Sequence, residues 1–233
     1  MNNFWPVKVL RFVTLFFVLA IALGMWFYPG GNIHDPEQLG YSFTHNFLSD
    51  LGGYQSHSDE VNFLSSFFFN LGMFLFIAVG IGFIFVRRLF SQNRVSNILA
   101  TTGSLFFFTG TVFFAGVGLT PYDLYLELHV FFAVNAFRLL VPGAFLYVLV
   151  LFRSKVSNRF ALVTMAYLAC VIAYVIYQLV AGNPFDSPEE MIRQATIQKL
   201  IVIASVICIF SLSFAFQKQI DLLDEAPDLS LIH

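Results

Sequence analysis

The chain has 233 residues, a formal net charge of −2 and a mean hydropathy of +0.77. Only 11% of its residues are charged, whereas a soluble domain carries roughly 25%. This deficit and the long apolar runs exclude an ordinary soluble domain and indicate a membrane protein. The small net charge predicts no nucleic-acid partner.

Six apolar segments are long enough to cross a bilayer as helices, which takes roughly 20 residues each. In chain order they are predicted at about residues 9–28, 63–86, 98–119, 126–152, 160–181 and 197–216. None alternates apolar and polar residues with period two, which disfavours a β-barrel. The sequence therefore predicts an all-α fold, a polytopic six-transmembrane-helix bundle over residues 1–218, followed by an acidic cytoplasmic tail over residues 219–233.

The first apolar segment has features of a signal peptide as well as of a membrane helix. Lys8 and Arg11 precede its centre, and the Ala-Ile-Ala of residues 20–22 has the small-x-small form of a cleavage site. The apolar run nevertheless continues to Tyr28, which is long for a signal peptide. We therefore expect this segment to be retained as the first membrane helix.

Positive charge is distributed unevenly over the predicted loops. Nine of the twelve Lys and Arg residues flank one set of helix ends, and residues 29–62 contain none. Because Lys and Arg concentrate on the cytoplasmic side of membrane proteins, both termini are predicted to be cytoplasmic and residues 29–62 to lie outside. Most histidines and acids then fall on the outer side, so any chemistry is expected to face outward.

The stretch THNFLSDLGG, residues 44–53, gathers polar side chains between two apolar runs. Helical spacing would place His45 beside Ser49 and Asn46 beside Asp50. Two interpretations stay open. The residues form a reactive or binding site at the membrane surface, or Ser49 and Asp50 cap a short helix while Asn46 bonds to loop backbone.

A second polar group follows the third predicted helix. Thr120-Pro121 is expected to end that helix, because proline cannot continue it, and Asp123 to cap the fourth. His129 lies at least a turn inside a Phe- and Val-rich helix, where polar groups usually face a cavity or a partner. It is either a member of a functional cluster or a satisfied core histidine.

Two cations lie in or near the predicted spans. Arg138 lies within the fourth helix, where it either snorkels inward or bonds to carbonyls near the Pro142 kink, or else grips a lipid phosphate or carboxylate. Lys199 is expected near the outer end of the sixth helix, beside Gln198. It would pair with Asp50 or Asp123, or bind an anionic lipid headgroup.

The motifs NFLSDLG, after the first helix, and GLTPYDLYLELH, across the third and fourth, resemble the domain-of-unknown-function 998 family of bacterial and archaeal membrane proteins. The resemblance covers most of the chain in layout. It implies a six-helix bundle, in the plasma (inner) membrane of a prokaryote, and no particular activity. The motif positions that it singles out are Ser49, Asp50, Gly52, Pro121, Asp123 and His129.

The same residues are similar, more weakly, to the membrane hydrolases related to alkaline ceramidase. Those enzymes use an intramembrane Ser, an Asp and several His around zinc. The present chain departs from them in having six predicted helices rather than seven and no HxxxH in its last helix.

One hypothesis is therefore a metal-dependent hydrolase that acts on a membrane lipid. A bound zinc would lower the pKa of a water and polarise a carbonyl or phosphoryl oxygen, and Ser49 would hydrogen-bond the oxyanion. The residues that would hold the metal are Asp50, Asp123 and His129, with His45 or His57.

The other main hypothesis is a bundle without enzymatic activity that binds a lipid or another membrane protein. Here Asp50 and Asp123 would pair with Lys199, and His129 would bond to Ser49 or Asn46. Transport is a third class, although no pair of Gly- or Pro-broken helices supports it.

Overall fold

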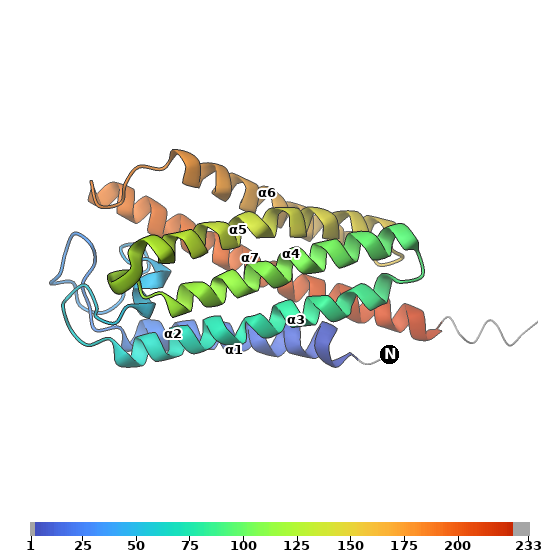
Figure 1. Ribbon diagram of the computed structural model, residues 1–233, viewed down its shortest axis with the longest axis horizontal. Helices are drawn as coiled ribbons and strands as arrows, with labels where there is room; N and C mark the ends of the chain where they lie inside the picture. The colour runs from blue at the N-terminus through green and yellow to red at the C-terminus, as the bar shows by residue number, and fades with distance from the viewer. Residues whose placement is uncertain (1–2, 226–233) are drawn as a thin grey trace, which may run out of the picture.

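The chain is mostly helical in the computed structural model, which describes residues 3–225 (Figure 1). No β-strand forms among these residues beyond two isolated bridges, Gly30–Leu39 and Gln55–Val61. In chain order the helices are η1 (Phe4–Val9), α1 (Leu10–Phe27), η2 (Leu48–Gly52), α2 (Phe63–Leu75), α3 (Ile77–Val86), η3 (Arg87–Phe90), α4 (Arg94–Leu119), α5 (Tyr122–Arg153), α6 (Asn158–Val180) and α7 (Pro188–Glu225).

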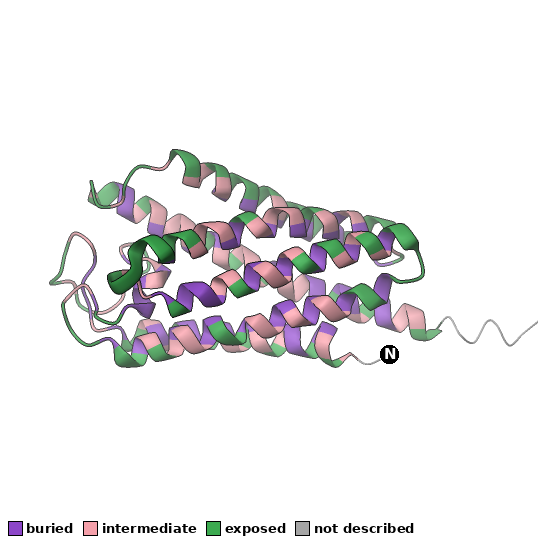
Figure 2. Cartoon of the chain, in the orientation of Figure 1, coloured by how far each residue is buried: buried purple, intermediate pink, exposed green. Residues whose placement is uncertain are grey.

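Within residues 3–225, six spans are long and apolar enough to cross a membrane; η1 and α1 together form the first, and α2, α3 and η3 together form the second. The prediction of an all-α, six-span bundle is confirmed, and the protein is an integral, multi-pass membrane protein. Exposed residues are distributed along the outward surface of the spans (Figure 2). Large apolar residues such as Phe12, Leu105 and Ile172 are among the exposed ones. Such a surface suits contact with lipid rather than with water.

The helices lie side by side along the long axis of the molecule (Figure 1). Residues 28–62, here called the capping loop, and the α6–α7 connection lie at one end, which we call the capped end. The start of η1 and the end of α7 lie at the opposite end, as an even number of spans requires.

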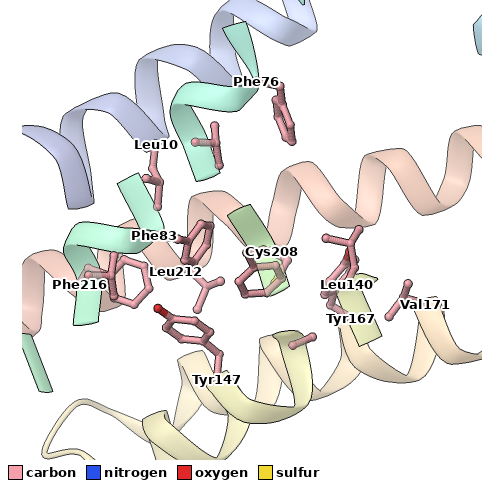
Figure 3. Packing of buried hydrophobic residues seen from close by; sticks show 14 of the residues in the cluster. Leu10, Phe76, Phe83, Leu140, Tyr147, Tyr167, Val171, Cys208, Leu212 and Phe216 are labelled. Carbon is pink, nitrogen blue, oxygen red and sulfur yellow. The ribbon is translucent and has the colours of Figure 1, made fainter. Parts of the chain in front are cut away.

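Apolar side chains, many of them aromatic, fill the centre of the bundle (Figure 3). Phe83, Tyr147 and Phe216, from α3, α5 and α7, pack with ring centroids 5.4–5.9 Å apart. The Tyr147 hydroxyl lies 2.7 Å from Ser104 Oγ, and Ser104 donates to the Phe83 carbonyl at 2.6 Å. The buried hydroxyls are therefore satisfied while they join three helices.

The last helix differs most from its predicted bounds. It begins at Pro188 instead of residue 197 and continues to Glu225, so residues 219–225 of the predicted tail are helical, while residues 226–233 lie outside the described range. Its 38 residues span about 57 Å, compared with roughly 30 Å for the hydrocarbon core. Polar residues fill its first turns, so a search for apolar runs does not detect them.

Arg138 is exposed on the surface of α5. It makes no hydrogen bond or ion pair with the described residues, so the predicted bonds to carbonyls near Pro142 are not present. Lipid binding by Arg138 stays a prediction.

Candidate ligand-binding site

The capping loop is tied to the helices that it covers. Its His34 Nε2 lies 2.9 Å from the Pro184 carbonyl oxygen, in the α6–α7 connection. Its Leu48 N–H donates to Gln198 Oε1 of α7 at 2.7 Å. These contacts hold the loop on the end of the bundle rather than leaving it free in water.

Asn46 is the central polar residue of the capping loop and is completely buried. Its Oδ1 accepts hydrogen bonds from Gln38 Nε2 at 2.7 Å and from the Ser42 N–H at 2.9 Å. Its Nδ2 donates to the Gly31 carbonyl at 2.8 Å and to Asp50 Oδ2 at 3.1 Å. One side chain thus joins four positions of the loop.

Asp50 caps the short helix η2. Its Oδ2 accepts from the Phe47 N–H at 2.9 Å, at the start of η2, and lies 3.5 Å from His57 Nε2. The capping interpretation is therefore confirmed for Asp50. Ser49 has no such role, because its hydroxyl makes no hydrogen bond with the described residues; it lines a cavity described below.

Helix η2 is fastened to α2 by a second buried amide. Asn62 Nδ2 lies 3.0–3.3 Å from the carbonyl oxygens of Asp50, Leu51 and Gly53. Ser65 Oγ also donates to the Leu51 carbonyl, at 3.2 Å. The carbonyls of η2, which has only five residues, thereby gain partners from the neighbouring helix.

Asp123 binds backbone instead of the predicted cation. Its two carboxylate oxygens accept from the N–H groups of Tyr54 and Gln55 at 3.0 and 2.9 Å. The prediction that Asp123 pairs with Lys199 is therefore wrong, since the loop reaches the start of α5 and occupies both oxygens.

Lys199 is buried, with 2% of its surface exposed. Its Nζ donates to the carbonyls of Asn46 and Ala195, and lies 5.5 and 5.3 Å from the ring centroids of Tyr41 and Phe43. Within residues 3–225, no carboxylate lies within ion-pair distance of it, so its predicted pairing with Asp50 is also wrong. Carbonyls and aromatic faces surround this cation instead.

His129 is buried in α5, where its Nδ1 lies 2.6 Å from the Thr120 carbonyl oxygen. A carbonyl can only accept, so Nδ1 carries the proton of this bond. The predicted bonds to Ser49 and Asn46 are not formed. His129 instead joins the start of α5 to the end of α4, where the carbonyls lack helical partners.

The candidate zinc ligands do not fit a metal site. Within the described part of the chain, no group of three His, Cys, Asp or Glu side chains is placed to hold a metal ion. The Asp123 oxygens are occupied by backbone N–H groups, and His45 Nδ1 lies 2.9 Å from Thr44 Oγ1 and 3.2 Å from Ser42 Oγ. Only Asp50 and His57 approach each other, so the metal-dependent hydrolase gains no support from the geometry.

Two hollows lie directly below the capping loop. The first, here called the α1–α7 groove, has a volume of about 270 Å³ and is lined by apolar side chains and by Lys199. The second, the central cavity, has a volume of about 70 Å³, and the described residues that line it are apolar except for four. These four are Ser49, His129, Gln198 and Ser205.

Two tyrosines of the capping loop have strongly perturbed acidity. Burial raises the pKa of Tyr41, and the negative charge of Asp50 raises it further. The same two causes, in the same order, raise the pKa of Tyr28. The Tyr41 hydroxyl lies 3.4 and 3.3 Å from the carbonyls of Asn46 and Phe47, and the Tyr28 hydroxyl lies 3.4 Å from the Gly31 carbonyl. Both tyrosines therefore belong to the polar network of the loop.

The sequence predicted that Ser49, Asp50, His129 and Lys199 lie at the same end of the bundle, and the structure places them there. The sequence did not identify Tyr41 or Gln38 as members of the polar network. Their only signal is their position in the same lysine- and arginine-free loop.

Comparison with known proteins adds no identification: no protein-family model, no curated protein and no solved structure matches the chain. The fold and the site define a six-span membrane protein with a capped, partly hollow end. The resemblance to the domain-of-unknown-function 998 family stays a prediction.

Proposed function

We propose that this protein binds an anionic amphiphile of the membrane, with its hydrocarbon chain in the α1–α7 groove and its headgroup at Lys199. The observation that carries the proposal is the lining of the groove. Phe17, Val18 and Ile21 of α1 face Val202 and Ile203 of α7 across it, and among the described residues that line it Lys199 is the only charged one.

The chemistry of Lys199 favours an anion as the headgroup. An ammonium group has three N–H donors, and two of them meet carbonyls, which carry only partial charge. A buried cation without a counter-ion is costly. A phosphate or carboxylate that approaches along the groove would supply the missing negative charge, and Phe43, which also lines the groove, would have to shift to admit it.

The lipids that accompany the purified protein test this proposal. Ile203 is 46% exposed and lines the groove, whereas Ile172 of α6 is 39% exposed and does not. We expect wild type and Ile172→Trp to retain an anionic lipid through detergent purification, as measured by native mass spectrometry. Ile203→Trp, which fills the groove, should lose it. Equal retention in the three proteins would overturn the proposal.

We also propose that the capped end faces the outside of the cell. The capping loop contains no Lys or Arg, while the opposite end carries Arg87, Arg88 and Arg153, as expected for a cytoplasmic side. In a variant without Cys170 and Cys208, a membrane-impermeant maleimide should label Glu60→Cys in intact cells but not Ser91→Cys. Labelling of Ser91→Cys but not of Glu60→Cys would show that the capped end faces the cytoplasm, contrary to the proposal.

A further inference from the structure

The α1–α7 groove and the central cavity share part of their walls. Phe17 of α1, Leu48 of η2, and Val202 and Val206 of α7 line both. The cavity therefore lies next to the groove, on its inner side, where α2, α4 and α5 also contribute to its lining. If the chain of a ligand lies in the groove and its headgroup lies at Lys199, the part of the chain nearest the headgroup lies next to the cavity.

The central cavity offers hydrogen-bond donors that the protein itself does not use. Gln198 Oε1 accepts from the Leu48 N–H, which leaves both N–H bonds of its side-chain amide without a partner among the described residues. Ser49 lines the same cavity, and its hydroxyl is equally unoccupied within residues 3–225. The Ser205 hydroxyl, in contrast, bonds to the Ile201 carbonyl at 2.8 Å and to the Tyr167 hydroxyl at 3.2 Å.

Donors in an otherwise apolar cavity are matched by a ligand that presents an acceptor. A carbonyl oxygen is such an acceptor, and in an amphiphile it is found in the ester or amide that joins the chain to the headgroup. An ether linkage has no carbonyl oxygen. The donor set therefore distinguishes acyl from alkyl chains.

We infer that the central cavity takes the carbonyl oxygen of an acyl linkage, with Gln198 and Ser49 as donors, so that the ligand class is an acylated anionic amphiphile. This inference rests on the proposed function, because the chain and the anionic group would occupy the groove and Lys199. It adds a specificity that neither of those features provides.

The experiment compares two probes that differ in this carbonyl. Equilibrium binding of 1-acylglycerol 3-phosphate and of 1-alkylglycerol 3-phosphate, with equal chain lengths, is measured on the full-length protein in nanodiscs of zwitterionic lipid. We expect the acyl probe to bind about fivefold more tightly, which corresponds to one net hydrogen bond. Equal affinities in the wild type would overturn the inference.

Substitutions of Ser49 and Gln198 test whether these donors cause the preference for the acyl probe. Ser49→Ala should reduce the preference for the acyl probe, and Gln198→Met should reduce it as well, whereas Ser205→Ala, in the same cavity, should retain it. Ser49→Ala is the decisive variant, because its hydroxyl holds no other part of the protein, whereas Gln198 also anchors Leu48. An unchanged preference in Ser49→Ala and Gln198→Met would overturn the assignment.

The two proposals fail in different ways. If the wild type binds both probes with equal affinity and Lys199→Met weakens both, the carbonyl inference is wrong and the proposed function stands. If neither probe binds to the wild type, the proposed function fails, and the inference that rests on it fails too.

Discussion

Lys199 of α7 donates a hydrogen bond to the backbone carbonyl of Asn46, the residue around which the capping loop is folded. The same Asn46 carbonyl lies 3.4 Å from the Tyr41 hydroxyl. The cation that lines the groove is thus also a fastening point of the loop above it. The stability of the capping loop and the occupancy of the α1–α7 groove should therefore depend on each other.

Asn46→Ala should lower the stability of the protein strongly. The change removes a buried side chain that bonds to Gln38, Ser42, Gly31 and Asp50. Buried groups left without partners cost about 1–3 kcal/mol each, so we expect a loss of about 2 kcal/mol or more. Thermal and chemical unfolding in detergent would measure it. Asn183→Ala, at an exposed site, is the control, and equal effects would contradict the central role of Asn46.

Gly52→Ala should displace η2 from α2. A Cβ atom at this position would lie 2.6 Å from the Phe69 ring, so either the ring or η2 must move. Overpacking of this kind costs about 1–3 kcal/mol, and Phe69→Leu in the same chain should recover part of the loss. Gly110→Ala, whose Cβ would meet its nearest atom at 3.4 Å, should be tolerated. Equal unfolding midpoints for Gly52→Ala and Gly110→Ala would contradict this expectation.

Alkaline pH should weaken the capping loop through Tyr41. Its pKa in the folded protein is raised by burial and then by Asp50, whereas the unfolded chain has the ordinary value of about 10. The unfolded state therefore loses its proton first, so the stabilisation is complete below about pH 10 and declines as the pH rises further. Tyr41→Phe should start from a lower unfolding midpoint, because the hydroxyl bonds to two carbonyls. Its midpoint should nevertheless fall less steeply between about pH 9 and about pH 11, whereas Tyr54→Phe, at an exposed site, should follow the wild type.

Purified protein should contain no stoichiometric zinc. The candidate ligands Asp50, Asp123 and His129 do not form a group of three that could hold a metal ion, and Asp123 is occupied by backbone N–H groups. Elemental mass spectrometry of wild type beside His129→Ala, both purified without chelator, would measure the metal directly. Near-stoichiometric zinc that is lost in the variant would restore the hydrolase hypothesis.

The spans were predictable because their signal is local. Bilayer thickness sets a minimum apolar length of roughly 20 residues, and each of the six apolar runs reaches it. The start of α7 was missed because its first turns carry Glu189, Glu190 and Arg193. These first turns lie outside the apolar run. They are stabilised by an ion pair between Arg193 and Glu190 and by the side chain of Ser187, which accepts from the Glu190 N–H.

The partners within the site were not predictable from the sequence in the same way. Matching opposite charges suggested that Lys199 pairs with Asp50 or Asp123. In the structure both carboxylates accept from loop N–H groups, and the path of a loop leaves no periodic pattern in the sequence. The shape of the α1–α7 groove depends on how α1 and α7, which are far apart in the sequence, pack against each other. The amphipathic pattern of either helix does not encode this packing.

Photo-crosslinking would show directly whether an acyl chain lies in the α1–α7 groove. A 1-acylglycerol 3-phosphate with a diazirine in its chain is bound to the wild-type protein in nanodiscs, irradiated, and mapped by peptide mass spectrometry. We expect adducts concentrated on the groove residues of α1 and α7, such as Val18, Ile21 and Ile203. Adducts spread evenly over the lipid-facing surface, with Leu105 of α4 and Leu162 of α6 labelled as strongly, would contradict it.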